Sequence, residues 1–396
     1  MAKKRICWLL KRWSSLLAIL WLAATVSAPR PQTVVASTTT QPWSTPAAVA
    51  EQMPHAARPA LAYTSDGSAH AVWESNGAVL YAARRAGEAW TQPQRLAAGV
   101  APTLAIDTKG ELNVVFSNQF MGDFEIYHIY QHAGQWSLPV NVSRTTGYSA
   151  QPTLTVTPDG ALHAAWMDNA PGYWIIYYGS LVGKFWSSQP VPNARGQAPT
   201  IAAAPNGTIY VAWQDRIVTD SEPGTFEILL SELVDRKWSL PVNISDVLQI
   251  DSLGPHLATT ADGLAHLTWV DQGRRVRYCY GEDDYWALPQ TVWQTAGRVR
   301  GPRILAEQGT LLHIAWDEGQ ILRVTTALAS APDWSKGDLI PATSGSLKDV
   351  TLTWLPQGGV AVGWVQASGP NDYGIYESRQ ASAFTWRAWL PRLLVR

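Results

Sequence analysis

Residues Gln151–Val191 read QPTLTVTPDGALHAAWMDNAPGYWIIYYGSLVGKFWSSQPV. This stretch contains four short apolar runs, separated by turn signals such as Asp159-Gly160 and Gly183-Lys184. The second run ends at Trp166, and a loop that contains an aspartate leads from it to the third. Runs of this length, with a turn signal about every eight to twelve residues, predict four β-strands joined as an antiparallel meander.

The same four-run unit occurs seven times in the chain. Each unit opens with a proline, replaced by Val350 in the last, and carries a large aromatic residue near the end of its second run. These anchor residues are Trp73, Phe116, Trp166, Trp213, Trp269, Trp316 and Trp364. Successive anchors lie 43, 50, 47, 56, 47 and 48 residues apart. A repeat of this length is typical of a β-propeller, so we predict an all-β fold of seven four-stranded antiparallel blades.

The residue pattern of the second run supports this architecture. Leu162, Ala164 and Trp166 share one face of the expected strand, and His163 and Ala165 share the other. Neither face is strongly polar, as expected when each blade is packed between two neighbours. A two-sheet sandwich would leave one face of each sheet in water and would show a more amphipathic pattern.

The fourth run has its own signature, which occurs eight times for seven units. Its tryptophans are Trp43, Trp90, Trp136, Trp186, Trp238, Trp286, Trp334 and Trp386. One copy is therefore spare, and we expect Trp43–Val49 to close the seventh blade, which removes two free sheet edges. The propeller is then residues 43–390, followed by a tail, 391–396; a competing closing strand at Ala388–Arg396 is the alternative.

The N-terminus has the features of an export signal. A basic segment precedes an apolar run at Ser14–Val26, and small residues follow. We expect residues 1–36 to be a signal peptide and 37–42 a linker, so that the protein is secreted or at the cell surface. An uncleaved membrane anchor is the alternative, although the run is shorter than the roughly 20 residues that a spanning helix needs.

Charge and cysteine content restrict the partners. Residues 1–36 hold six Lys/Arg and no Asp/Glu, so their removal takes the formal charge from −1 to −7. A mildly acidic chain without basic clusters is a poor partner for nucleic acid or anionic membranes. Cys7 lies in the signal, which leaves Cys279 without an internal disulfide partner. No nucleotide-binding or metal-ligand spacing occurs, so we expect neither a cofactor nor a metal. We also expect a monomer.

The turn before the fourth run resembles a known motif. Gly87–Trp90 and Gly183–Trp186 keep a Gly-x-x-Trp pattern, and Trp136–Pro139 and Trp238–Pro241 keep the Trp-Ser-x-Pro that follows it. This is similar to the Asp box (BNR repeat) of secreted propellers of the sialidase superfamily, over residues 43–390. The aspartate of the motif is missing from most units, and Arg85 stands in its place in the first.

The resemblance implies a fold and little about activity. Sialidases are six-bladed and clamp a carboxylate with three arginines, beside a Tyr/Glu nucleophile pair and an Asp acid/base. Their Arg-Ile-Pro motif is absent here, since Pro302-Arg303-Ile304 has another order. No catalytic residue is therefore carried over. If the protein is an enzyme, the resemblance implies an exo-sialidase-like glycoside hydrolase.

Loop lengths indicate which face carries the function. The turns between first and second runs are short and uniform, as at Asp159-Gly160 and Asn206-Gly207. The second-to-third loops and the connections between units lie on the opposite face and vary in length, the longest being Gln214–Thr225 and Ser245–Leu253. Variable loops on a rigid scaffold are where binding sites concentrate.

Acidic residues recur two positions after the anchor, at Asp168, Asp215, Asp271 and Glu318. A ring of carboxylates at one mouth could bind a cation or supply a general acid/base pair. Their repetition equally fits a structural role, in which each carboxylate caps backbone amides at the start of a loop. The histidines three residues before an anchor, such as His163, fit packing between blades rather than a metal site.

Residues that depart from the repeat are stronger candidates for a site. Arg58, Arg300 and Arg303 stand where units one and six begin, near the expected channel mouth, and arginines there could bind a carboxylate, sulfate or phosphate. Solvated rim charges are the alternative. Tyr173 and Trp174 place aromatic rings on a variable loop, where they could stack on sugars or simply pack the loop.

These observations favour a non-catalytic binding module for carbohydrate or another extracellular ligand. A divergent sialidase-like glycoside hydrolase and a protein-interaction scaffold are the alternatives. A hydrolase needs two carboxylates about 5–10 Å apart, or a Tyr/Glu pair, beneath an arginine cluster.

Overall fold

The computed structural model describes residues 42–381, apart from 121–122, 220–221, 246–248, 283–284, 308–310, 335–336 and 342–344. The expected signal peptide, nearly all of the linker and the tail at 391–396 lie outside these residues. The described residues belong to one compact unit, Gln41–Arg396. They contain no helix, and hence none that is long and apolar enough to cross a membrane.

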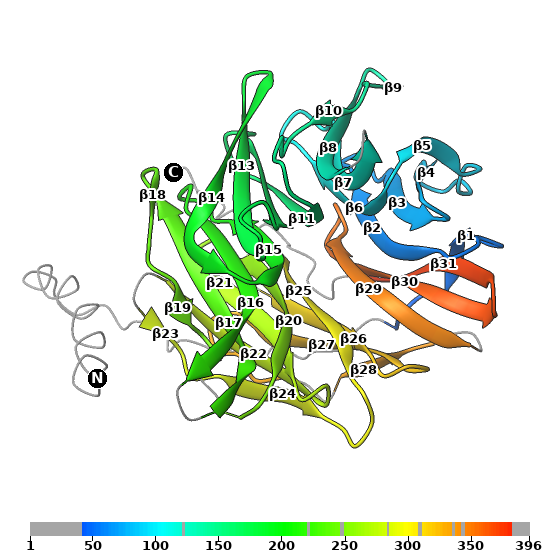
Figure 1. Ribbon diagram of the computed structural model, residues 1–396. Helices are drawn as coiled ribbons and strands as arrows, with labels where there is room; N and C mark the ends of the chain where they lie inside the picture. Colours follow the sequence, from blue (N-terminus) through cyan, green and yellow to red (C-terminus); the bar gives the residue numbers. More distant parts are fainter. Residues whose placement is uncertain are drawn as a thin grey trace, which may run out of the picture. The chain divides into compact units, whose positions relative to one another are not determined.

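The described strands form seven antiparallel sheets, so the predicted seven-bladed propeller is confirmed (Figure 1). Blade 1 consists of β2 (Ala57–Tyr63), β3 (Ala69–Ser75), β4 (Ala78–Arg84) and β5 (Gln94–Ala98). Blade 2 consists of β6 (Val100–Ile106), β7 (Leu112–Phe120), β8 (Asp123–His132), β9 (Gln135–Trp136) and β10 (Val140–Asn141). Blade 3 consists of β11 (Ser149–Val156), β12 (Leu162–Asp168), β13 (Ile175–Val182) and β14 (Phe185–Arg195).

The remaining blades follow the same order. Blade 4 consists of β15 (Gln197–Ala203), β16 (Ile209–Thr219), β17 (Glu222–Val234), β18 (Lys237–Trp238) and β19 (Val242–Asn243). Blade 5 consists of β20 (Ser252–Thr259), β21 (Ala265–Asp271), β22 (Arg275–Glu282), β23 (Tyr285–Trp286) and β24 (Gln290–Gln294). Blade 6 consists of β25 (Arg300–Glu307), β26 (Leu311–Asp317), β27 (Leu322–Leu328) and β28 (Asp338–Ile340). Blade 7 consists of β29 (Ser346–Trp354), β30 (Gly359–Gly369), β31 (Asp372–Ala381) and the N-terminal β1 (Ala47–Ala50).

Two features complete the ring of blades. Strand β1 pairs antiparallel with β31, so a strand from the start of the chain forms the outer edge of a sheet built from its end. The first strand of each blade contacts the first strands of the blades on either side, and β29 of blade 7 contacts β2 of blade 1. The seven first strands therefore surround the centre of the ring (Figure 1).

The anchor residues form the interfaces between blades. All seven have no exposed surface, and each belongs to a hydrophobic cluster that it shares with the preceding blade. Trp166, for example, packs with Val115 and Ile126 of blade 2, and Trp73 packs with Val365 and Ile375 of blade 7. The apolar character of both strand faces has this cause, because each sheet is covered on two sides.

Long second-to-third connections form hairpins rather than open loops. Strands β16 and β17 are paired from Ile209–Leu233 to Thr219–Glu222. The pairing therefore continues into residues Gln214–Thr225, which we expected from the sequence to form a loop. Strands β7 and β8 extend in the same way, to the pair Phe120–Asp123. Pairing satisfies the backbone donors and acceptors that a long loop would expose, which explains the difference.

The histidines before the anchors have structural partners. The Nδ1 atoms of His70, His163 and His266 lie 2.9, 2.6 and 2.8 Å from the hydroxyl groups of Tyr81, Tyr178 and Tyr278. Each of these tyrosines in turn contacts edge-on a tryptophan of the next blade, with ring centroids 4.8–5.2 Å apart. The histidines thus act through packing between blades.

His128 on β8 occupies the position that these tyrosines have in the other blades, and its ring contacts edge-on Trp186 of the next blade. The indole Nε1–H of Trp186 on blade 3 donates to its Nδ1 at 3.2 Å, and its Nε2 lies 3.0 Å from Asn113 Oδ1. Because Nδ1 accepts a hydrogen bond, it carries no proton, and the ring is neutral with its proton on Nε2, which donates to Asn113. Burial lowers the pKa of His128 from 6.5 to about 4.

A buried ion pair joins blades 7 and 1. Glu377 on β31 is completely buried, and its carboxylate lies 2.9 Å from the guanidinium of Arg84 on β4. The Tyr63 hydroxyl donates to the same carboxylate, and burial beside Glu377 raises the pKa of Tyr63. Among the described residues, the cation that pairs with Glu377 comes from the neighbouring blade.

Replacing Arg84 by methionine leaves the buried Glu377 carboxylate without its cation. We expect Arg84→Met to lower the free energy of unfolding by about 3–5 kcal/mol. The double variant Arg84→Met/Glu377→Gln should lose less, because the uncompensated charge is gone. Urea unfolding of the three proteins measures both values, and a double variant less stable than Arg84→Met would contradict this account of the pair.

Acidification should destabilise the protein through His128. Its pKa is lower in the folded state, so the unfolded state binds a proton first, and stability is lost as pH falls from about 6.5 to about 4. The loss from this one group is about 3 kcal/mol. His128→Gln should therefore lose less stability than the parent between pH 7 and pH 4.5.

The parent has to be compared with His128→Gln because burial raises the pKa values of Glu125 and Asp317. These two groups bind a proton first in the folded state, so they increase stability as pH falls, in the direction opposite to His128. Urea unfolding of both proteins at several pH values, with pH 8 as reference, gives the difference between their losses of stability. Parallel curves for parent and variant would show that His128 does not titrate in this way.

Candidate functional site

The two faces of the propeller differ in their loops. On one face, turns such as Thr64–Ser68 repeat the same hydrogen bond, from a threonine hydroxyl to an aspartate two residues later. On the other, the first strands begin, the second strands end, and the long β7–β8 and β16–β17 hairpins are found. We call this second face the variable-loop face.

A central cavity of about 370 Å³ lies where the first strands begin on the variable-loop face. Blades 1 to 5 each line it with the proline that opens the unit and the residue on either side of it. Blade 6 contributes Arg303, and blade 7 contributes Asp349–Leu352. All seven blades therefore reach this cavity, with Ala-Pro-Thr in both blade 2 and blade 4 and other residues at these positions in the remaining blades.

A repeated backbone distortion shapes the cavity wall. In every blade the register between first and second strands shifts at this point, and the residue before the proline or Val350 has a positive φ of 49–64°. These residues are Arg58, Ala101, Gln151, Ala198, Gly254, Gly301 and Asp349. Five of the seven are not glycine, although the left-handed conformation costs each about 1 kcal/mol or more.

Side chains of the preceding blade hold this distortion in place. The backbone N–H of Arg58 donates to Asp349 Oδ2 at 3.1 Å, and that of Gly254 donates to Gln214 Oε1 at 2.8 Å. The bulges are thus fixed from outside their own sheet. The cavity wall is a rigid feature that the contacts between blades define.

The charged groups of the cavity are Arg58, Arg303 and Asp349, and His256 also lines it. Two of the three predicted arginines, Arg58 and Arg303, thus reach one cavity. The third, Arg300, is placed elsewhere, since it lies 2.7 Å from Asp317 and donates to the carbonyl of Leu347.

Arg303 is not neutralised by a carboxylate in contact. Arg84, Arg277, Arg300 and Arg323 each lie 2.7–3.1 Å from an acidic side chain. Among the described residues no such ion pair within 4.0 Å reaches Arg303 or Arg58. Arg303 donates to the carbonyl of Pro302 at 3.2 Å. Burial lowers the pKa of Arg303, the charge of Asp349 raises it in part, and the charge of Arg58 lowers it further.

His256 is neutral and its tautomer is fixed. The N–H of Ile304 donates to its Nδ1 at 3.3 Å, so the ring proton is on Nε2. Burial and the charge of Arg303 lower the pKa of His256 to about 3. His256 therefore offers the cavity wall a neutral N–H donor rather than a free base.

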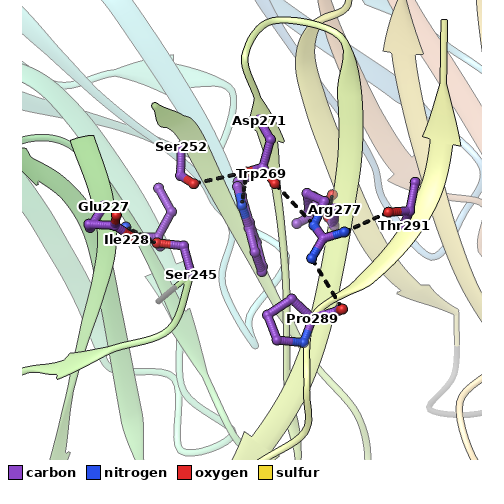
Figure 2. A network of polar contacts seen from close by, with 10 residues as sticks. Glu227, Ile228, Ser245, Ser252, Trp269, Asp271, Arg277, Pro289 and Thr291 are labelled. Atoms are coloured by element: carbon purple, nitrogen blue, oxygen red, sulfur yellow. Dashed lines mark hydrogen bonds and ion pairs between the residues drawn. The ribbon is translucent and has the colours of Figure 1, made fainter. Parts of the chain in front are cut away.

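Two of the predicted carboxylates lie in closed hydrogen-bond networks. Asp168 is completely buried and accepts bonds from Thr145, Ser149 and the N–H of Ala170. Figure 2 shows Asp271, which accepts from Ser252 and from the indole of the anchor Trp269 and pairs with Arg277. These geometries favour the capping role over ligand binding.

The structure brings Asp215 and Tyr173 together through a residue that the sequence did not single out. The guanidinium of Arg195 lies 4.3 Å above the ring of Tyr173. Its charge also acts on Asp215, whose pKa burial raises and Arg195 lowers. Tyr173 remains 47% exposed. This cluster joins blades 3 and 4 on the variable-loop face.

Trp174 belongs to a group of three aromatic residues from blades 2 and 3. Its ring packs edge-on against Tyr148 at 5.9 Å, and Tyr148 packs against Phe124 at 4.5 Å. Tyr148 is 40% exposed. We call Phe124, Tyr148 and Trp174 the aromatic ledge.

Sequence reasoning missed several residues of the cavity, namely Gln151, His256 and Asp349. All three stand beside the residue that opens a repeat unit, where the other units carry small residues or threonine. Alignment of these positions, unit against unit, is the signal that could have found them. Among the described residues, no group of three His, Cys, Asp or Glu side chains could hold a metal ion.

No family model and no curated protein matches the chain in sequence. Solved structures match in fold. A protein of unknown function from Dyadobacter fermentans DSM 18053 has 13% identity and a TM-score of 0.53, over 85% of this chain and 99% of that one. An ulvan lyase of polysaccharide lyase family PL25, bound to -[GlcA(1-4)Rha3S]-, has 12% identity and a TM-score of 0.59, over 83% and 94%.

A third structure is the α-L-arabinanase of Penicillium chrysogenum complexed with arabinobiose. It has 13% identity and a TM-score of 0.53, over 74% of this chain and 100% of that one. At these identities the three likenesses concern the fold. The chain is a seven-bladed propeller, and these solved structures resemble it in fold.

Proposed function

We propose that the protein is an exported, non-catalytic carbohydrate-binding propeller that takes an acidic group of its ligand into the central cavity. The observation that carries this proposal is the pair of arginines, Arg58 and Arg303, in one cavity, whose guanidinium groups form no ion pair within 4.0 Å among the described residues. Guanidinium groups bind carboxylates and sulfates through paired, charge-assisted hydrogen bonds.

The rest of the cavity suits such a ligand. Two arginines and one aspartate leave a single positive charge in excess, and His256 adds no charge because its pKa is about 3. Hydroxyl groups of Thr103, Thr153 and Thr351 supply further polar contacts along the wall. A cavity of about 370 Å³ lies near the lower end of the range for small-molecule pockets, about 300–1,000 Å³.

Two of the similar folds bind carbohydrate according to their descriptions, one of them a chain that contains GlcA and Rha3S and the other arabinobiose. These likenesses, at 12–13% identity, add support for carbohydrate as ligand class. The export signal expected at residues 1–36 places such a ligand outside the cell.

The cavity favours binding over hydrolysis. A glycosidase uses two carboxylates, about 5–10 Å apart, or a Tyr/Glu pair in sialidase-like enzymes. Among the described residues that line the cavity, Asp349 is the one carboxylate, and tyrosine and glutamate do not occur. His256 cannot serve as a base at Nδ1 while that atom accepts the N–H of Ile304.

Acidic monosaccharides should bind more tightly than their neutral counterparts. We expect glucuronate or galacturonate to bind at least tenfold more tightly than glucose or galactose. Arg303→Gln and Arg58→Gln should each weaken this binding about 10- to 100-fold, because a hydrogen bond to a charged group contributes about 1.5–3 kcal/mol. NMR titration of the purified chain measures these affinities, and Arg303→Lys should retain part of them.

Arg85→Gln is the matched control, since Arg85 is exposed in the turn after β4 and does not line the cavity. The variant should bind like the parent. If it loses as much affinity as Arg303→Gln, or if neutral sugars bind as well as acidic ones, the cavity arginines do not select the ligand.

Bound saccharides should remain intact. Prolonged incubation of the protein with acidic oligosaccharides should release no new reducing or unsaturated ends, as followed by chromatography and absorbance. Cleavage that disappears in Asp349→Asn, with binding retained, would show instead that the cavity is an active site.

A further inference from the structure

The aromatic ledge lies next to the central cavity. Tyr148 stands three residues before Gln151 of the cavity wall, and three residues span at most about 11 Å. From the other side, the carbonyl of Trp174 accepts the N–H of Gly196 at 3.0 Å, two residues before Ala198 of the cavity wall. Two backbone segments thus connect the ledge to the cavity directly.

The ledge is held in a fixed conformation. The N–H of Tyr148 donates to Asn169 Oδ1 at 2.7 Å, and the N–H of Asn169 donates back to the carbonyl of Tyr148 at 3.3 Å. These bonds join the segment that enters blade 3 to its second-to-third loop. The ring of Tyr148 is packed between Phe124 and Trp174, which restricts its rotation. Rings fixed in advance bind with little loss of conformational entropy.

The ledge is also open to solvent. Tyr148 is 40% exposed and Phe124 and Trp174 are half-buried, although large aromatic side chains are usually buried. Tyr173, next to Trp174 in sequence, is 47% exposed, with Arg195 over its ring. The exposed ring surfaces are available to the apolar C–H patches of a sugar.

Long hairpins of blades 2 and 4 flank blade 3, where the ledge lies. Blade 2 contributes β7–β8, from which Phe124 comes, and blade 4 contributes β16–β17, which extends to the pair Thr219–Glu222. In blade 5 the corresponding strands pair only to Asp271–Arg275. The variable-loop face thus carries long hairpins on both sides of blade 3, and the β30–β31 hairpin of blade 7 extends in the same way, to the pair Gly369–Asp372.

We infer that the ligand is a saccharide chain, with an acidic residue in the central cavity and the next residues stacked on the aromatic ledge over blade 3. This inference rests on the proposed function, because it needs the cavity to bind the acidic group. The cavity supplies charge, the ledge supplies apolar contact, and their adjacency gives preference for oligomers over monosaccharides. Tyr148 and Trp174 are the stacking residues, with Tyr173 beside them.

A length series tests the inference. The probes are the monomer, dimer and tetramer of the galacturonate, alginate and hyaluronan series, titrated by calorimetry or NMR against the full chain. For a series that binds, the tetramer should bind at least tenfold more tightly than the monomer. Tyr148→Ala and Trp174→Ala should each remove about tenfold of the tetramer affinity and leave the affinity for the monomer within about twofold of the parent.

Phe185→Ala is the matched control, since Phe185 is 78% exposed at the start of β14, at the end of the blade opposite the variable-loop face. It should bind every length like the parent. Tyr148→Phe, which keeps the ring, should also retain tetramer binding and thereby separate loss of stacking from loss of folding.

The outcomes separate the two proposals. Equal affinity for monomer and tetramer, or a loss of tetramer affinity in Phe185→Ala equal to that in Trp174→Ala, would overturn the ledge while leaving the cavity intact. Absence of binding at every length, or binding that Arg303→Gln does not weaken, would overturn the proposed function itself.

Discussion

The structure depends on the burial of one large aromatic side chain at each of seven interfaces. Each anchor residue is completely buried and packs against the sheet that precedes its own. A four-stranded sheet that is apolar on both faces is unstable alone, because water would contact one or both faces. The first blade has no predecessor in sequence, so Trp73 packs on the last, and the chain forms a ring.

The centre of the ring follows from this packing. The anchors lie on the second strands, and the first strands contact one another around the axis. Each first strand begins with a bulge, and the residues at this bulge line the cavity. Side chains at the bulge line the cavity, and some also bond the next blade, as Asp349 does with the N–H of Arg58. Residue type varies there from blade to blade, and this chain places Arg58, Asp349 and Arg303 next to one another in the ring.

The candidate residues fall into two groups for the same reason. Acidic residues that repeat after the anchors, such as Asp168 and Asp271, hold the ends of strands and loops together. Arg58 and Arg303 break the repeat and reach the cavity. Arg300 also breaks the repeat, but a bulge lies between it and Arg303, and the guanidinium of Arg300 pairs with Asp317. Arg303, three residues later, lines the cavity, whereas Arg300 has a structural role.

The sequence by itself determined the number of blades, the place of the anchors and the face that carries variable loops. These features depend on periodicity and on side-chain size, which local sequence records directly. The tertiary structure alone decided which side chains meet. Arg303 of blade 6, Asp349 of blade 7 and Arg58 of blade 1 are far apart along the chain, and only closure of the ring brings them to one cavity. The same holds for Tyr148 and Trp174, whose contact depends on how the entry to blade 3 is bonded to its loop.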